Sequence, residues 1–474
     1  MQNSEFSKDF EQNKTRIDAL LHVKESFDLI YRVVMIGGKK ACFYLVDGFC
    51  KDEVMEKILE FLYHISPGEM PQTAHDFLKE KLPYGEIDLV DTEEVLIQKI
   101  LSGVSVLLID GYDKIIAMDF RAYPARSVEE PGKEKVMRGS RDGFVETLVY
   151  NTALVRRRIR STELVMEMHT VGKNSRSDVV IAFMKNRVEP EMLADIRRRI
   201  DSIDVDAITM NQQSLAECLY QHKWYNPFPK FKFSERPDTT AASILEGSIA
   251  ILVDNSPSAM ILPTSVFDIV EDADDYYFPP VTGTYLRISR MIINFTAVVL
   301  TPFFLLLLKN PEWIPASLEF IKISDPVHVP IFLQMLILEF AIDGLKLASL
   351  NTPNTLSTPL SVVAGIVLGD YTVSSGWFNS EIMLYMAFVA VANYTQVSFE
   401  LGYALKFMRL ITICLTAAFN LWGFIGGIAI TVVSIVCNRT ISGKSYIYPL
   451  IPFNPKQFLK RFCRISLPNS DKRM

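Results

Sequence analysis

The chain has 474 residues and a formal net charge of −6. This length is enough for two or three domains that each bury their own core. The acidic balance, together with basic runs that lack interleaved aromatic residues, argues against a nucleic-acid-binding protein. The sequence shows no nucleophile–base pattern and no set of metal ligands, so we expect neither an enzyme nor a bound cofactor or metal.

Residues 1–125 carry the pattern of an α+β lobe. Two β-rich runs lie within 28–46 around Gly37 and Gly38, and residues 51–64 repeat apolar side chains at helical spacing. Apolar runs at 102–111 and 114–120 predict a hairpin. A linker rich in proline and charge follows at 126–137.

Residues 138–240 predict a second α+β lobe, with a helix over 142–160, a strand over 177–184 and a helix over 189–202. Both lobes hold enough apolar residues for independent cores, so we expect residues 1–240 to fold without the rest of the chain.

The next segment, 241–286, combines a juxtamembrane hairpin (248–253 with 259–262) with an acidic loop at 268–277. The loop lacks the central glycine and final glutamate of a calcium loop, which favours solvated charge over a cation site.

The region 287–437 predicts an all-α polytopic membrane domain. Its first apolar run, 291–308, is uncharged and long enough to span a bilayer. Further spans are expected near 329–350, 360–377 and 381–397. The stretch 410–437 is too long for one untilted helix and is interrupted by a glycine-rich segment, which indicates a helical hairpin. Four crossings, or six with short or re-entrant elements, both fit this pattern.

Charge at the two ends of this region predicts its orientation. Arg287 and Arg290 precede the first span, and the tail 438–474 has eight Lys or Arg against Asp471, a net charge of +7 that leaves −13 for the rest. Positive charge marks the cytoplasmic side and can hold anionic lipid headgroups. Residues 1–16 hold no apolar export signal. The six cysteines lack C-x-x-C spacing, as in a reducing compartment. We therefore expect head and basic tail on the cytosolic side.

Glu339, Asp343 and Lys346 fall on one face of the second predicted span. An internal ion pair between Asp343 and Lys346 is one interpretation, and it leaves Glu339 without an evident partner. We favour a face that lines a polar cavity or pore, because ionisable groups at membrane depth usually face protein or water. We then expect Glu339→Gln to impair cation flux without loss of protein.

Six other polar residues of the membrane region are candidates for the same lining: Asp370, Asn393, Glu400, Thr412, Thr416 and Asn420. For Asp370 the favoured alternative is a position at the membrane interface. The threonines can instead bond to the backbone of their own helix.

Four arginines, Arg156, Arg157, Arg158 and Arg160, form a basic cluster in the second lobe. We expect them to pair with acids such as Glu129, Glu130 and Glu134 at contacts between domains or between subunits, and they are candidates for a subunit contact.

Long motifs carry a family resemblance over nearly the whole chain. They are RAYPARSVEEPGKEKVMRGSRDGFVETLVYNTALVRRRIR (121–160), YNPFPKFKFSERPD (225–238), LEGSIAILVDNSPSAMILPTSVF (245–267) and YPLIPFNP (448–455). With these motifs the chain resembles the A subunits of the GerA family of spore germination proteins. The resemblance implies a cytosolic two-lobed head, a C-terminal membrane domain in the spore inner membrane, and a homo-oligomeric ring, with a pentamer as the expected size. It also implies conduction of monovalent cations, contact with membrane lipid, and partnership with other germination membrane proteins.

The leading functional prediction is therefore a subunit of a cation-conducting channel, since rings of acidic side chains favour cations. A non-conducting scaffold for germination proteins is the first alternative. The second is a transporter of a small spore-core anion such as dipicolinate, which would show inverted repeats and discontinuous helices. K⁺ flux in liposomes discriminates among the three.

Overall fold

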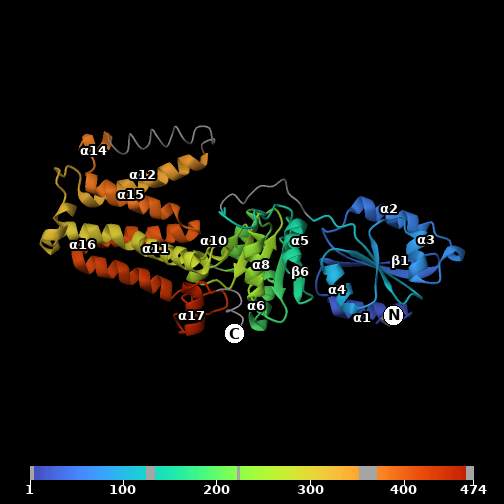
Figure 1. Ribbon diagram of the computed structural model, residues 1–474. Helices are drawn as coiled ribbons and strands as arrows, with labels where there is room; N and C mark the ends of the chain where they lie inside the picture. Colours follow the sequence, from blue (N-terminus) through green and yellow to red (C-terminus); the bar gives the residue numbers. More distant parts are fainter. Residues whose placement is uncertain (1–4, 124–133, 221–224, 352–370, 466–474) are drawn as a thin grey trace. The chain divides into compact units, whose positions relative to one another are not determined.

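The computed structural model describes residues 5–123, 134–220, 225–351 and 371–465 (Figure 1). The chain forms two compact units. The head unit comprises Met1–His222 and Phe231–Pro263, and the helical unit comprises Lys223–Lys230 and Thr264–Met474.

The first lobe of the head is a five-stranded antiparallel sheet covered by helices on both faces. Gly37 and Gly38 turn with φ of +53° and +78°, which suits the two-residue hairpin that joins the first two strands. In sheet order the strands are β1 (Leu29–Ile36), β2 (Lys39–Val46), β4 (Ser105–Ile109), β5 (Ile115–Met118) and β3 (Ile87–Val90).

Figure 1 shows helices on either side of this sheet. Two separate apolar cores result, one under each pair of helices. One pair is α1 (Phe10–Leu21) with α4 (Glu93–Leu101), and the other is α2 (Asp52–Tyr63) with α3 (Ala74–Lys81), which are joined through η1 (Pro67–Glu69).

The second lobe repeats this arrangement. Its helices α5 (Leu148–Arg158) and α8 (Pro237–Leu245) pack on one core, and α6 (Pro190–Asp201) and α7 (Asn211–Leu219) contact the sheet as well. Its antiparallel strands, in sheet order, are β6 (Leu164–Val171), β7 (Ser177–Met184), β9 (Ile249–Val253), β10 (Ala259–Leu262) and β8 (Lys232–Ser234).

The hairpin placed at 248–262 by the sequence forms, but its assignment to a separate juxtamembrane segment, 241–286, is wrong. β9 lies in the middle of the second sheet, between β7 and β10, and all five of its residues are buried. The second lobe therefore extends beyond residue 240 to Pro263.

Where the structure describes it, the helical unit consists of helices and the loops that join them. Within the described residues, α11 and α16 are long and apolar enough to cross a membrane, and α15 is shorter but apolar. Most of the span expected at 360–377 lies outside the described residues. The elements are α9 (Val266–Val270), α10 (Asp274–Tyr277), α11 (Pro280–Lys309), η2 (Pro311–Trp313), η3 (Ala316–Ile321), α12 (Ile331–Asn351), α14 (Thr372–Ser374), α15 (Ser380–Tyr394), α16 (Phe399–Val436) and α17 (Pro455–Phe462).

The helical hairpin predicted for 410–437 is confirmed. Asn420 interrupts α16 with φ 52° and ψ −129°, so the element folds back into two arms, 399–419 and 421–436. A Cβ atom at Gly427 would lie 2.7 Å from the Cα of Thr412, and one at Gly423 would overlap the carbonyl oxygen of Leu415. The missing side chains let the two arms pack closely, as small residues do between membrane helices.

One short segment of the helical unit comes from far upstream. We call Lys223–Lys230 the strap, because it leaves the head sequence between α7 and β8. Its Phe228 is fully buried against Tyr446. The Nζ of Lys230, also buried, donates to the carbonyl oxygen of Arg439 at 2.5 Å and to the side chain of Asn438.

Candidate functional site

The centre of the helical unit holds a fully buried ion pair between Glu339 of α12 and Arg409 of α16. Arg409 donates from Nε to Oε1 at 2.6 Å and from Nη2 to Oε2 at 2.9 Å. The exposed fractions are 1% for Glu339 and 0% for Arg409. A third donor, Nη1, reaches the carbonyl oxygen of Ala297 in α11 at 2.8 Å. One guanidinium therefore joins three helices.

A second ion pair lies directly beside the first. The Nζ of Lys406 pairs with the carboxylate of Asp343 and lies 3.6 Å from Oε2 of Glu339. It also donates to the carbonyl oxygen of Glu339 at 3.1 Å. We call Glu339, Asp343, Lys406 and Arg409 the charge cluster. Its two acids and two bases sum to zero, which lowers the cost of holding charge among apolar helices.

The charge cluster changes the interpretation of Glu339. The sequence left this carboxylate without an evident partner, whereas Arg409 satisfies both of its oxygens. A bidentate, charge-assisted pair is among the strongest polar contacts in a protein. Glu339 is thus sequestered from any aqueous path within this chain, while the side chain of Asp343 remains 30% exposed.

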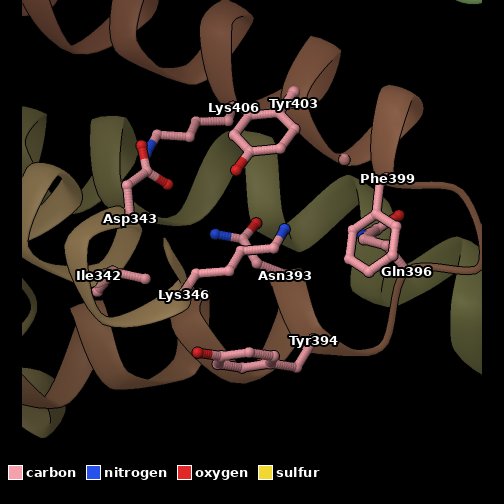
Figure 2. A pocket seen from close by; sticks show the side chains of 10 residues that line it. Ile342, Asp343, Lys346, Asn393, Tyr394, Gln396, Phe399, Tyr403 and Lys406 are labelled. Carbon is pink, nitrogen blue, oxygen red and sulfur yellow. The ribbon is translucent and has the colours of Figure 1, made fainter. Parts of the chain in front are cut away.

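Asp343 faces a small cavity at the junction of α12, α15 and α16 (Figure 2). Its volume of about 20 Å³ is enough for roughly one water molecule. Figure 2 shows Lys346 extended toward the rings of Tyr403 and Phe399, while Asp343 meets Lys406. The lining comprises Ile342, Asp343, Lys346, Asn393, Tyr394, Gln396, Phe399, Gly402, Tyr403 and Lys406. The cavity brings together three predicted site residues: Asp343, Lys346 and Asn393.

The polar stripe on α16 lies inside the hairpin. Thr412 donates to the carbonyl oxygen of Met408 at 2.8 Å and Thr416 to that of Thr412 at 2.7 Å, and both threonines are fully buried. Asn420 exchanges two amide hydrogen bonds with Asn310, at 2.7 and 2.9 Å. The two threonines thus bond to their own helix, and Asn420 links the turn of the hairpin to the end of α11.

Two remaining candidates lie elsewhere. Glu400 is exposed in the first turn of α16. Asp370 lies outside the described residues.

The sequence favoured solvated charge for the acidic loop, and this prediction is wrong. Asp275 is fully buried, with Arg287 Nε at 3.3 Å and Arg290 also bound to it. Glu271 lies 2.8 Å from Nη2 of Arg287 and 3.0 Å from Nη1 of Arg461 in α17. Arg287 and Arg290 follow the loop closely in sequence and Arg461 comes from far downstream, so the loop is part of a buried ion-pair network. Among the described residues, no group of three or more His, Cys, Asp or Glu could hold a metal ion.

Arg156 is not a subunit contact, because it is fully buried inside the head. Its Nε donates to Oδ2 of Asp28 at 2.6 Å and its Nη2 to Oδ1 at 3.0 Å. This ion pair links the first lobe to the second. Arg158 pairs with Asp142 at 2.5 Å.

The other two arginines lie beside Tyr123. The guanidinium of Arg157 is 4.5 Å from the ring centroid, and Arg160 lies 3.4 Å from the hydroxyl. Of the acids expected to pair with the cluster, Glu129 and Glu130 lie outside the described residues. Glu134 instead accepts from Ser234 Oγ at 2.8 Å, and its burial raises its pKa.

Two residues of the charge cluster escaped the sequence-based selection. Neither Lys406 nor Arg409 is among the candidates chosen from the sequence. The signal that identifies them is their spacing: two cations at i and i+3 in an apolar helix match two acids at i and i+4 in another.

Comparisons with known proteins cover almost the full sequence. The family model described as "Bacillus/Clostridium GerA spore germination protein" matches residues 17–474. Stage V sporulation protein AF of Bacillus subtilis is 33% identical over 449 residues, which cover 94% of this chain and 91% of that protein. The uncharacterized membrane protein YfkQ of Bacillus subtilis is 27% identical, over 92% of this chain and 85% of that protein. Spore germination protein A1 of Bacillus subtilis is 26% identical, over 100% of this chain and 97% of that protein.

One solved structure is also similar to part of the chain. It is the crystal structure of the N-terminal domain of the A subunit of the Bacillus megaterium spore germinant receptor GerK3. The identity is 22% and the TM-score 0.42, with 56% of this chain and 98% of that chain covered.

The fold and the site define a class of protein: a head of two α/β lobes followed by apolar helices that bury ion pairs, with two helices among the described residues suited to a membrane. The family follows from the match over nearly the whole sequence. This chain belongs to the GerA family of spore germination proteins.

Proposed function

We propose that this chain is an integral membrane protein of the spore inner membrane whose homo-oligomeric ring conducts monovalent cations during germination. The head and the basic tail lie on the side of the spore core, where Arg287, Arg290 and the +7 tail favour them. Other germination membrane proteins and membrane lipid are its partners. Family membership and the two apolar helices support the proposal.

The observation that supports ion conduction is the arrangement of charge around Asp343. Glu339 and Arg409 are sequestered as an anchor between helices, whereas Asp343 keeps part of its surface and lines a small cavity with Asn393. In a ring, each subunit would contribute one partly exposed carboxylate, and a ring of acidic side chains favours cations over anions. We therefore assign the ion-facing role to Asp343 and the structural role to Glu339.

The test compares Asp343→Asn with Glu339→Gln in the full chain reconstituted in liposomes. Asp343→Asn should lower K⁺ flux severalfold and reduce K⁺/Cl⁻ selectivity at matched protein. Glu339→Gln should instead lower abundance or melting temperature, because it leaves Arg409 buried without its partner charge, at a cost of about 3–5 kcal/mol. Glu319→Gln, at an exposed glutamate of η3, is the matched control and should change neither.

The outcomes separate the candidate functions. Wild-type protein that passes no ion would refute conduction and leave a scaffold. One observation favours anion transport as the second candidate: the charged groups at the cavity, Asp343, Lys346 and Lys406, sum to +1. Flux of anions without cations would replace the channel proposal with this one.

A further inference from the structure

We infer that the cavity beside the charge cluster is a monovalent-cation site that the chain fills with its own cation, the ammonium group of Lys346. The inference deepens the proposed function, and the blocking role of Lys346 rests on that proposed function. The site itself stands on the geometry of α12, α15 and α16.

The ammonium group lies against two aromatic rings. Nζ of Lys346 is 4.5 Å from the ring centroid of Phe399 and 4.6 Å from that of Tyr403. Both distances are within the roughly 6 Å range of cation–π attraction, which strengthens as the cation loses water. The rings stand one turn apart on α16, so they face the same side of the helix. Figure 2 shows both rings beside the end of the Lys346 side chain.

Three other polar side chains line the cavity. Asn393 and Gln396 carry amide oxygens, and Asp343 carries a carboxylate. Ring faces beside a few polar groups suit a weakly hydrated cation of single charge such as ammonium or K⁺. A divalent cation is disfavoured, because Lys406 already neutralises Asp343.

Charge makes the tethered cation and a free one mutually exclusive. The charge cluster sums to zero, so Lys346 gives the cavity its excess positive charge. The volume left beside it, about 20 Å³, holds roughly one water, so a free cation there would lie in contact with the ammonium group. Like charges at that distance repel, so a free cation enters only when the ammonium group leaves, which makes Lys346 a built-in blocker of a cation path.

The test uses detergent-purified full chain and measures Tm against K⁺ and propylammonium, with N-methylglucamine as the bulky reference ion. Lys346→Ala opens a gap that propylammonium matches in length and charge. We expect a saturable rise in Tm of a few degrees with propylammonium and with K⁺ in the variant and none in the wild type, since a ligand that binds only the folded state stabilises it. Adding Phe399→Leu and Tyr403→Leu to the variant should abolish the rise.

A matched control and a second variant keep the result decisive. Lys322→Ala, at an exposed lysine paired with Glu319, should gain no cation-dependent shift. If Lys346→Ala does not fold, Lys346→Met keeps the apolar stem and should show the K⁺ effect. A folded variant without any shift relative to N-methylglucamine overturns the inference.

Liposome flux distinguishes this inference from the proposed function. If Lys346 blocks a conducting path, its removal should raise basal K⁺ leak severalfold. Cation-dependent stabilisation without flux in any variant would keep the site and refute conduction. Conduction by the wild type, with neither stabilisation nor added leak in the variants, would refute the tethered cation and keep the channel.

Discussion

The two lobes of the head have the same succession of elements. The first runs α1-β1-β2-α2-α3-β3-α4-β4-β5, with η1 between α2 and α3, and the second runs α5-β6-β7-α6-α7-β8-α8-β9-β10. Their sheets repeat one strand order, β1-β2-β4-β5-β3 and β6-β7-β9-β10-β8. The difference lies before the edge strand: five residues, 82–86, join α3 to β3, whereas the strap lies between α7 and β8. The same topology thus occurs twice: the first lobe is continuous in sequence, whereas the chain of the second lobe also contributes the strap to the helical unit.

Cutting the chain inside the second lobe should have the largest effect. A fragment 1–240 lacks β9 and β10, and β9 is a fully buried inner strand of its sheet. We expect this fragment to lose the second lobe, contrary to the expectation from sequence, and a fragment 1–263 to unfold cooperatively. Circular dichroism during thermal unfolding distinguishes them. Equal cooperativity in both fragments would show that the second sheet does not need its inner hairpin.

Breaking the ion pair between the lobes should have the next largest effect. Asp28→Asn leaves Arg156 buried without its counter-ion, so we expect the free energy of unfolding to fall by about 3–5 kcal/mol. Urea denaturation of residues 1–263 measures it. The control is Asp142→Asn, whose partner Arg158 is 19% exposed and where about 1 kcal/mol or less is expected. Similar losses for both variants would remove the special role of the pair between lobes.

The smallest effect should be a pH dependence confined to the second lobe. The carboxylate of Glu167, 3.8 Å from Nε2, together with the charge of Asp201, raises the pKa of His169 above its ordinary 6.5. The protonated form therefore stabilises the fold fully below about pH 6.5, and the contribution is lost as pH rises through the folded-state pKa. His169→Gln should flatten this slope in urea titrations between pH 6 and 8.

Val34 holds the same place in β1 that His169 holds in β6, the sixth residue of an eight-residue strand. The first lobe has no titratable group there. An unchanged slope in His169→Gln would assign the pH dependence to another group.

Local periodicity predicts elements better than it predicts their partners. The strand at 177–184 and the helix at 189–202 match β7 and α6 closely, because their apolar spacing is a property of consecutive residues. The hairpin at 248–262 was predicted, but its place within the second sheet depends on pairing with β7, more than sixty residues upstream. Spacing within a segment contains no information about such distant contacts.

The same limit applies to the candidate site. The face with Glu339 and Asp343 was evident from its charge in an apolar run. Its partners Lys406 and Arg409 lie 63 and 70 residues away in sequence, on another helix. The acidic loop was misread for the same reason, since Arg461 lies 190 residues beyond Glu271. Matching unpaired acids with unpaired bases between apolar helices would have recovered the charge cluster.

The strap also constrains the order in which the protein can be completed during synthesis. Lys230 emerges from the ribosome early, yet its partner Asn438 follows 208 residues later. Until then Phe228 lacks the Tyr446 side chain against which it packs. The ribosome must therefore complete both arms of the α16 hairpin before the strap can pack against its partners. A nascent chain stalled ahead of residue 438 would expose this apolar segment to chaperones and proteases.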